Sequence, residues 1–506
     1  MIKVIDNWLN RITMYRLAAY YLAFLLVIAS VLSFARILRF DPFALIFTTG
    51  FLIAACWLAN TIFARVFRVP ANTESVYITA LILALIVSPL TGYPDLVFIG
   101  WMAVLAMASK YIVAISGKHI FNPAAFAAVV IALTINQTAS WWVGSVPMLP
   151  FVLVGGLLIV RKLRRSAMVM SFFIAALLTT ISFGIAGGSD LLKVLGEMVA
   201  ASPLLFFGFV ILTEPLTMPP TRGLQMVYGA LVGVLFSPQV HFGSFYITPE
   251  LAIVMGNVFS YLVSPKRKLV LSLVDKIHIG SDLWDFVFLP DRQFSYAPGQ
   301  YMEWTLGHDD PDSRGNRRYF TLASSPTEKH LRVGIKFPAD ASSYKRSMLA
   351  MESQTEIVAA QLAGDFTLPH DQSQKIVMIA GGIGITPFRS MLKYLLDKNQ
   401  RRPITLFYAN RTVNDIVYRD IFDAARQKLG IRTIYTLTDT ARVPSYWNGK
   451  QGYIDAQMIK LEVPDYQRCL FYISGPDAMV AAFQATLSEM GVHKRQIRTD
   501  FFPGFA

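Results

Sequence analysis

Three residues in one short segment have side chains suited to holding a flat, phosphate-bearing cofactor. Arg318, Phe320 and Thr321 lie in a run of apolar and β-branched residues that stops at Pro326, which predicts a strand. Residues two apart share one face of a strand, so Arg318 and Phe320 can lie along one ligand, a cation for phosphate and a ring for a ring. Thr321 turns its hydroxyl to the other side or onto the edge of that ring. A surface strand without a ligand can carry the same residues, so the pattern alone leaves both interpretations open.

A glycine-rich turn further along the chain could bind a pyrophosphate. The apolar run 376–380 predicts a buried parallel strand, the glycine turn 381–387 follows it, and 388–396 is expected to be helical. Where a strand, a glycine turn and a helix start meet, backbone N–H groups point at a phosphate. Glycine lets the backbone approach closely, and Pro387 suits a first helical turn. The alternative is an ordinary turn between a strand and a helix.

Several segments taken together resemble one family of flavoproteins. Besides the two segments above, matches lie at 298–301, 342–345, 364–366, 474–476 and 500–505, in the family's order. The chain from about residue 268 onward therefore resembles the ferredoxin–NADP reductase family. This resemblance implies a flavin-binding β-barrel followed by a nicotinamide-nucleotide domain, with FAD and NAD(P)H as cofactors.

The resemblance also implies roles for single residues around FAD. Arg318 would hold the pyrophosphate, Phe320 would lie on the isoalloxazine, and Thr321 would hydrogen-bond near its N5. The family more often has tyrosine where Phe320 stands. Phe505 resembles the C-terminal aromatic residue that covers the other face of the flavin. Ser342 and Ser343 could donate to phosphate or simply cap a helix, and both possibilities stay open.

For the nicotinamide dinucleotide, the resemblance points to the glycine turn and to a second loop. The implied binding residues are Gly382, Gly384, Thr386, Pro387, Gly475 and Pro476. Ser474 stands where many relatives have a cysteine beside the nicotinamide ring. Hydride transfer depends on positioning more than on acid–base help, so a serine should slow the reaction without abolishing it. Arg411 either contacts a ribose 2′-phosphate or is a plain surface arginine, so the choice between NADH and NADPH stays open.

Composition separates the chain into an apolar first half and a more polar second half. Its 506 residues are 54% hydrophobic, with a mean hydropathy of +0.46, and the apolar residues gather in the first half. The net charge is +13, and many cations edge apolar segments, which favours a lipid bilayer over nucleic acid as the partner. Two cysteines are too few for an iron–sulfur cluster or a disulfide framework, and no metal site is expected.

Ten apolar stretches have about the 17–25 residues that a bilayer crossing needs. They lie near 15–38, 42–64, 74–91, 95–115, 122–137, 146–162, 166–186, 194–213, 223–239 and 247–264. An even number of spans puts both chain ends on one side, and Lys and Arg gather on every second connection. The positive-inside rule then predicts a multi-pass protein of the inner cell membrane, with both termini and the second half in the cytoplasm.

The apolar half also shows a weak internal repeat. Pro89 and Pro215 occupy similar Pro-Leu-Thr segments, and Pro123 and Pro249 form a second pair at the same offset of about 126 residues. Five spans in each half would make the two halves inverted in the membrane. Prolines at matching places in inverted halves predict broken helices around a binding site. The alternative is a chance match at loop ends, where proline is common.

The first half has a looser resemblance of its own. Over about 70–264 it resembles the large membrane subunits of the sodium-pumping NADH:quinone reductase and of the Rnf complex, through segments 118–124 and 212–217. This resemblance implies a second flavin, FMN or riboflavin, in the membrane. In those subunits FMN is attached to a threonine in a Ser-Gly-Ala-Thr-like motif, which is not found here, so a second flavin is expected to be non-covalent.

Asn122 and Glu214 are the candidate membrane acceptor site. Each stands directly before one of the repeated prolines. An acid beside a buried span is costly, which favours a functional role for Glu214, although at a span end it could lie among lipid headgroups. Both breaks are expected on the cytoplasmic side, where a pocket between them could accept electrons.

These inferences give one overall prediction. The fold is a polytopic α-helical membrane domain of about ten spans with an inverted repeat (1–265), an FAD-binding antiparallel β-barrel (266–372) and an α/β nicotinamide-nucleotide domain (373–506). The function is a flavoprotein oxidoreductase passing electrons from NAD(P)H through FAD to a bound flavin, a quinone or a redox partner protein. One alternative is a haem enzyme of the NADPH-oxidase or ferric-reductase type. A second is a transporter with a regulatory reductase domain. Only His119 and His241 lie in the apolar half, too few for paired haem ligands.

Overall fold

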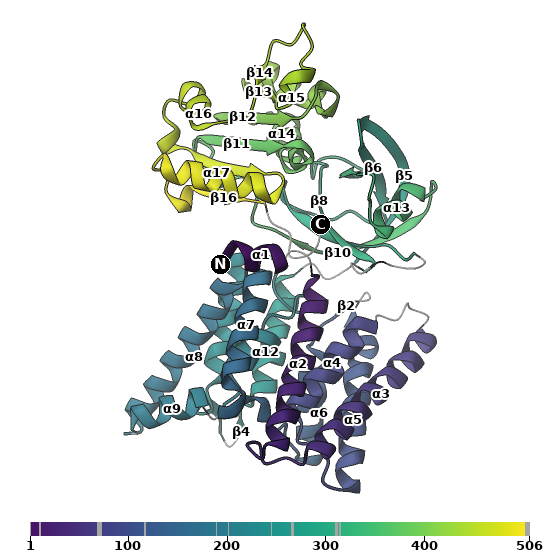
Figure 1. Cartoon of the computed structure of the whole chain (residues 1–506), viewed down its shortest axis with the longest axis vertical. Coiled ribbons are helices and arrows are strands. Elements are labelled where there is room, and N and C mark those ends of the chain that lie inside the picture. The colour runs from purple at the N-terminus through teal and green to yellow at the C-terminus, as the bar shows by residue number, and fades with distance from the viewer. Residues whose placement is uncertain are drawn as a thin grey trace. The chain divides into compact units, whose positions relative to one another are not determined.

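The computed structural model divides the chain into two compact units between Lys268 and Leu269 (Figure 1). It describes residues 2–9, 12–67, 73–115, 118–188, 190–200, 202–243, 245–264, 268–308, 312 and 315–500. We call the part up to Lys268 the helical unit and the part from Leu269 the sheet unit. The predicted boundary at 265/266 lies three residues before the observed division.

Among the described residues of the helical unit, five helical segments are long and apolar enough to cross a membrane. They are α2 (Met14–Phe34), α3 (Pro42–Phe67), α5 (Tyr93–Ile112), α7 (Leu149–Leu163) together with the short turn before it, and α8 (Ser166–Ala186). A sixth candidate joins α9 (Leu191–Ala200) to α10 (Leu204–Phe206) and the π-helical turn η3 (Phe207–Ile211), with a bend of 60°.

The other apolar helices of the described residues are shorter than a bilayer crossing requires. They are α4 (Thr73–Ile86), α6 (Pro123–Ile135), α11 (Arg222–Phe236) and α12 (Pro249–Val263), preceded at the chain start by α1 (Ile2–Leu9). Helices of 13–15 residues extend only about 20 Å, against about 30 Å of hydrocarbon. Each predicted span therefore contains a helix, but the structure supports several long apolar helices and not ten complete spans. Prolines, hairpins and left-handed residues such as Asn136 end these helices early.

Two short segments of the helical unit share the same order of elements. The hairpin β1 (Ala114–Ile115) and β2 (Lys118–His119) leads to α6, and the hairpin β3 (His241–Phe242) and β4 (Phe245–Tyr246) leads to α12. Each helix starts with its proline, and the residue before that proline caps it. Asn122 Oδ1 accepts from Ala125 N at 3.0 Å, and Thr248 Oγ1 accepts from Leu251 N at 3.4 Å.

The first part of the sheet unit is a six-stranded antiparallel sheet in the order β8-β7-β10-β5-β6-β9. Its strands are β5 (Leu269–Gly280), β6 (Leu283–Pro290), β7 (Tyr301–Thr305), β8 (Arg317–Thr321), β9 (Leu331–Lys336) and β10 (Glu356–Ala363), and α13 (Ser343–Ala350) follows β9. The edge strands β8 and β9 do not pair as strands. A backbone hydrogen bond from Ala323 N to Arg332 O joins the chain near their ends, so the predicted barrel is a half-barrel. The strand expected up to Pro326 ends at Thr321.

The second part of the sheet unit is a six-stranded parallel sheet in the order β14-β13-β12-β11-β15-β16. Its strands are β11 (Ile376–Gly381), β12 (Ile404–Asn410), β13 (Arg432–Leu437), β14 (Lys450–Gln451), β15 (Leu470–Ser474) and β16 (Ile497–Thr499). The main helices are α14 (Thr386–Asp397), α15 (Arg419–Leu429), α16 (Ala456–Glu462) and α17 (Asp477–Glu489). The alternating α/β pattern predicted from the sequence is confirmed.

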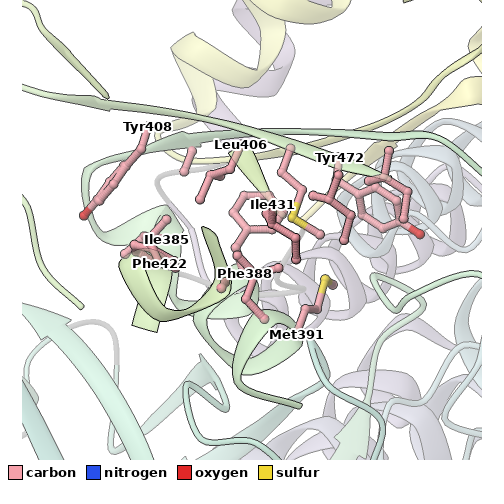
Figure 2. Close-up of a cluster of buried hydrophobic side chains, with 14 of the residues drawn as sticks. Ile385, Phe388, Met391, Leu406, Tyr408, Phe422, Ile431 and Tyr472 are labelled. Atoms are coloured by element: carbon pink, nitrogen blue, oxygen red, sulfur yellow. The ribbon is translucent and has the colours of Figure 1, made fainter. Parts of the chain in front are cut away.

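Alternation along β11 explains why this sheet is covered on both faces. Met378 belongs to a cluster with Phe388 and Phe422 from α14 and α15, and Figure 2 shows this cluster. Val377 and Ile379 point to the other face, into a second cluster with residues of α16 and α17. Because β12 and β15 lie on opposite sides of β11, the carboxyl ends of β11 and β15 form the switch point of the sheet, where such folds bind ligands.

Candidate functional site

Arg318 and Phe320 lie on the same side of strand β8, as the spacing predicts. The Arg318 guanidinium is 5.0 Å above the Tyr344 ring, and the Phe320 ring centroid is 6.1 Å from that of Tyr344. Trp304, paired with Arg318 across the sheet, contacts Phe320 edge-on at 6.4 Å. Arg318 is only 1% exposed. Tyr344 and Trp304 thus form the floor on which the two predicted cofactor residues lie, a role that sequence reasoning did not assign to them.

The start of helix α13 and Arg318 converge on one carboxylate. Ser343 N donates to Asp312 Oδ2 at 3.1 Å, and Arg318 Nη2 lies 3.6 Å from Asp312 Oδ1. Ser342 caps the helix by accepting from Lys345 N at 3.3 Å, and the Ser343 hydroxyl accepts from Asp312 N at 2.9 Å. A helix N-terminus and a buried guanidinium that together hold an anion are suited to a pyrophosphate. Arg318 and the Ser343 N–H therefore fit the phosphate-binding roles implied for these two residues, with the Asp312 carboxylate as the anion that they hold here. The Ser342 hydroxyl instead serves as the helix cap.

The two predicted catalytic residues share one hydrogen-bond acceptor. Thr321 Oγ1 lies 3.4 Å from Asp500 Oδ2, and Ser474 Oγ donates to the same oxygen at 3.2 Å. Thr321 ends β8, Ser474 ends β15, and Asp500 follows β16, where its N–H donates to Ile473 O. Both hydroxyl groups are buried. In the sequence Asp500 is only part of the C-terminal motif. Its two hydroxyl partners come from distant segments, so no local pattern predicts its role.

The glycine turn lies against the loop that follows β15. A Cβ at Gly384 would stand 2.4 Å from Ser474 O and 2.6 Å from Gly475 N, so only glycine fits this backbone contact. Gly382 has φ +53°, and no atom lies within 4 Å of its Cβ position. The helix expected from 388 begins earlier, at Thr386, and both Thr386 and Pro387 are buried in its first turn. Gly382 fits a cradle for phosphate, whereas Gly384 is also required by packing.

Two other predicted positions have different outcomes. Arg411 is exposed, and its Nε lies 3.6 Å from Asp439 Oδ2; Arg442 Nε lies 3.7 Å from the same oxygen. A carboxylate therefore stands between two guanidinium groups at the carboxyl edge of the parallel sheet. Phe505 lies outside the described residues, as does the rest of the chain after Asp500.

The helical unit contains a cavity that joins the two predicted acceptor residues. Its cavity volume is about 80 Å³, within a region of about 820 Å³ that includes open solvent, between α2, α4, the start of α6, α7 and the segment after η3. Its walls are mostly apolar. The polar lining side chains are Tyr15, Ser75, Thr79, Asn122, Lys162, Thr213 and Glu214.

Hydrogen bonds tie the two proline breaks of this cavity together. Asn122 Nδ2 donates to Glu214 Oε2 at 2.9 Å, and the Thr217 hydroxyl donates to the same oxygen at 3.2 Å. His119 Nε2 is 3.9 Å from the other oxygen of Glu214. Asn122 N donates to Asn257 Oδ1 at 2.8 Å. Segments far apart in the sequence thus meet at one carboxylate. The sequence did not single out Asn257, and it pointed to His119 only as a haem-ligand candidate.

Within the described residues, no three His, Cys, Asp or Glu side chains gather as metal ligands. Around both candidate sites, the groups present are those that bind phosphate, flat rings and hydrogen-bonding head groups.

Sequence comparison relates the sheet unit to known reductases. Residues 378–485 match the family described as the oxidoreductase NAD-binding domain. A flavohemoprotein of Bacillus cereus is 26% identical over 241 residues, which is 46% of this chain and 60% of that protein. The glycine betaine monooxygenase reductase subunit of Chromohalobacter salexigens is 25% identical over 224 residues, which is 42% of this chain and 60% of that protein. A solved FAD/NAD-binding domain of nitric oxide dioxygenase from Vibrio cholerae aligns with 46% of this chain and 98% of its own length, at 19% identity and a TM-score of 0.41.

These similarities identify the second half of the chain as a ferredoxin–NADP reductase-like FAD- and NAD-binding unit, of the kind found in NAD(P)H-dependent FAD oxidoreductases. The chain spans about 60% of the length of the curated relatives it matches. The resemblance of the helical unit to membrane subunits of redox pumps stays a prediction.

Proposed function

We propose that the chain is a membrane flavoenzyme that passes electrons from NAD(P)H through FAD to an acceptor held by its helical unit. The observation that carries this proposal is the convergence of Thr321 and Ser474 on Asp500, beside the glycine turn at the switch point of the parallel sheet. The convergence brings the strand assigned to the flavin and the loop assigned to the nicotinamide to one point. Direct hydride transfer requires the nicotinamide and flavin rings to bring their reacting atoms to about 3–3.5 Å.

The chain's own residues bind and orient the reactants. FAD, when bound, accepts a hydride from reduced nicotinamide and passes electrons on singly or in pairs. Arg318 and the N-terminus of α13 bind phosphate, and Phe320 supports the ring system. Asp500 accepts a hydrogen bond from each hydroxyl, so the oxygens of Thr321 and Ser474 keep lone pairs for N–H groups of the ligands. Gly382 and the start of α14 supply N–H groups for the dinucleotide phosphates.

The cavity of the helical unit is the proposed place of the electron acceptor. Its apolar walls suit a flat ring, and the Asn122–Glu214 pair with Lys162 offers polar contacts at one edge. A non-covalent flavin, a quinone or a group presented by a redox partner protein would meet these requirements. The five long apolar helices found in the described part of the chain, and the cations that edge them, support a position in the inner membrane, with the sheet unit and both termini in the cytoplasm.

An absorption spectrum of the purified full-length chain tests the proposal. We expect flavin bands in the oxidised protein that bleach when NADH or NADPH is added without oxygen. A protein that holds no FAD, or whose flavin stays oxidised with both nucleotides, would contradict the proposal. A Soret band that shifts on reduction would instead support the haem-enzyme alternative.

A further inference from the structure

Helix α14 is tied to the segment that follows strand β8. Arg389, in the first turn of α14, donates from Nη1 to Ala323 O at 2.8 Å and to Glu328 Oε2 at 2.7 Å. Its Nη2 donates to Glu328 Oε1 at 3.0 Å, which completes a two-pronged ion pair. The neighbouring Ser390 hydroxyl donates to Ser324 O at 2.5 Å. One turn of helix is therefore fixed at several points to one short stretch of chain.

The two ends of this connection belong to the two cofactor-binding segments. Arg389 follows the glycine turn by only a few residues, and Ala323 is two residues beyond Thr321. Only Leu322 stands between Thr321, the last residue of β8, and Ala323. A shift of Ala323 therefore also shifts the end of β8. The guanidinium of Arg389 thus connects the part that holds the nucleotide to the part that holds the flavin.

The connection is buried and further supported by charged neighbours. Arg389 is 4% exposed, and its guanidinium lies 5.2 Å above the Tyr418 ring. Tyr418 donates to Asp285 Oδ1 at 3.2 Å, and Arg332 donates to Asp285 Oδ2 at 2.8 Å. Burial, the largest single influence, disfavours the charged form of Glu328. The hydrogen bonds and charge of Arg389, the Ser325 N–H and the charge of Arg332 together outweigh burial and hold the pKa of Glu328 below its ordinary value.

Stability alone is a weak reason for such a pair. Removing two charges from water costs about as much as their attraction returns, and buried ion pairs can often be replaced by apolar side chains without loss of stability. A two-pronged arginine–carboxylate pair does fix distance and angle, which a lysine cannot reproduce. The expected contribution of Arg389 is therefore geometric.

We propose that Arg389, held by Glu328, is a positioning residue for hydride transfer: it sets the distance between the glycine turn of the nucleotide and the end of strand β8 at the flavin. This inference rests on the proposed function. Reacting atoms must approach to about 3–3.5 Å, and a misplacement of about 1 Å can cost on the order of a hundredfold in rate. A loosened connection should therefore slow flavin reduction while leaving both ligands bound.

Two variants of the full-length chain test the role of Arg389. Arg389→Lys keeps the charge but loses the fork, and the double variant Arg389→Met with Glu328→Met removes both charges from the buried site. For each we would measure FAD content, the thermal midpoint, nucleotide affinity, the rate of flavin reduction at saturating nucleotide, and the isotope effect with nucleotide deuterated at the transferred position. The nucleotide is whichever of NADH and NADPH reduces the parent faster.

We expect both variants to keep FAD and to bind nucleotide with an affinity within about twofold of that of the parent. Their flavin should be reduced at least about tenfold more slowly than in the parent, with a larger isotope effect. The matched control is Arg432→Lys, whose ion pair with Glu462 lies at the amino end of β13, away from the glycine turn. It should behave as the parent does.

Several results would overturn the proposal. One is a variant whose rate of flavin reduction and isotope effect equal those of the parent. Another is a variant in which only the FAD content, the nucleotide affinity or the thermal midpoint falls, which would show a merely structural role. If Arg389→Lys does not fold, the double variant decides alone. The parent is measured first: a parent that neither NADH nor NADPH reduces refutes the proposed function and this role with it, whereas a reducible parent with unaffected variants refutes only the role of Arg389.

Discussion

At the scale of single residues, the role of Thr321 depends on the direction of its hydrogen bond. Its hydroxyl donates to Asp500, so its oxygen can accept from a ligand. Removing one such hydrogen bond typically costs about 0.5–1.5 kcal/mol, or about two- to thirteenfold in rate if it acts only in the transition state. Thr321→Ala should therefore slow flavin reduction by about that factor, with nucleotide affinity within twofold. Stopped-flow absorbance at the flavin bands measures both.

Thr321→Ser is the control for this prediction, because it keeps the hydroxyl and removes only a methyl group. It should reduce at nearly the parental rate. A Thr321→Ala variant as fast as the parent would show that the hydroxyl has no part in the reaction.

A second residue-scale prediction concerns the choice of nucleotide. Arg411 and Arg442 both lie within 3.7 Å of the Asp439 carboxylate, which offsets one of their two positive charges and would itself repel a 2′-phosphate. Asp439→Asn should release both guanidinium groups, so the ratio of kcat/KM for NADPH over NADH should rise by about tenfold, equivalent to about 1.4 kcal/mol. Steady-state kinetics with both nucleotides measures the ratio.

The double variant Asp439→Asn with Arg411→Ala is the control. It should gain less for NADPH than Asp439→Asn alone, because one of the two released cations is missing. An unchanged ratio in both variants would place the ribose site elsewhere.

At the scale of elements, the proline breaks of the helical unit make the strongest prediction. A helix that begins at Pro123 leaves its first N–H groups to other partners, and Asn122 caps them while its amide holds Glu214. Free backbone groups inside a bilayer are tolerated only around protein or a cavity, and here a cavity is present. Asn122→Ala with Glu214→Gln should leave reduction of FAD by NAD(P)H intact. Electron delivery to the membrane acceptor should fall at least about tenfold, or about 1.4 kcal/mol of barrier.

The measurement is reoxidation of the reduced flavin by a soluble quinone in lipid vesicles. Glu197→Gln, which removes an exposed carboxylate on α9, is the matched control and should be unaffected. Unchanged delivery in the double variant would place the acceptor elsewhere and leave the helical unit as an anchor.

At the scale of the whole molecule, the distribution of charge predicts the orientation in the membrane. Arg161, Lys162, Arg164 and Arg165 crowd one connection, whereas the connection at Gly187–Gly188 carries few cations. A reporter fused after Ala506 should therefore be active only if it works in the cytoplasm. A reporter inserted at Gly187–Gly188 should be active only if it works outside. The opposite pattern would mean that the charge bias misleads or that the number of spans is odd.

The sequence by itself determined the parts of this protein that depend on local chemistry. Apolar runs such as 376–380, the glycines that follow them and the resulting α/β alternation are recorded in neighbouring residues, because backbone freedom and periodicity act over a few positions. For the same reason, the apolar runs correctly predicted a helix within each expected span. They did not give the lengths of these helices, because a hairpin or a left-handed residue ends a helix without a strong compositional signal.

Only the tertiary structure decided which distant side chains meet. The sequence placed Asn122 and Glu214 before prolines, but their contact at 2.9 Å depends on how two broken helices pack. In the same way, Asp500 joins Thr321 to Ser474, and Arg389 joins Glu328 and Ala323. The number of residues between these segments does not predict how far apart they lie in space. Such contacts are set by strand order, helix crossing and packing, which bring together side chains that no local pattern connects.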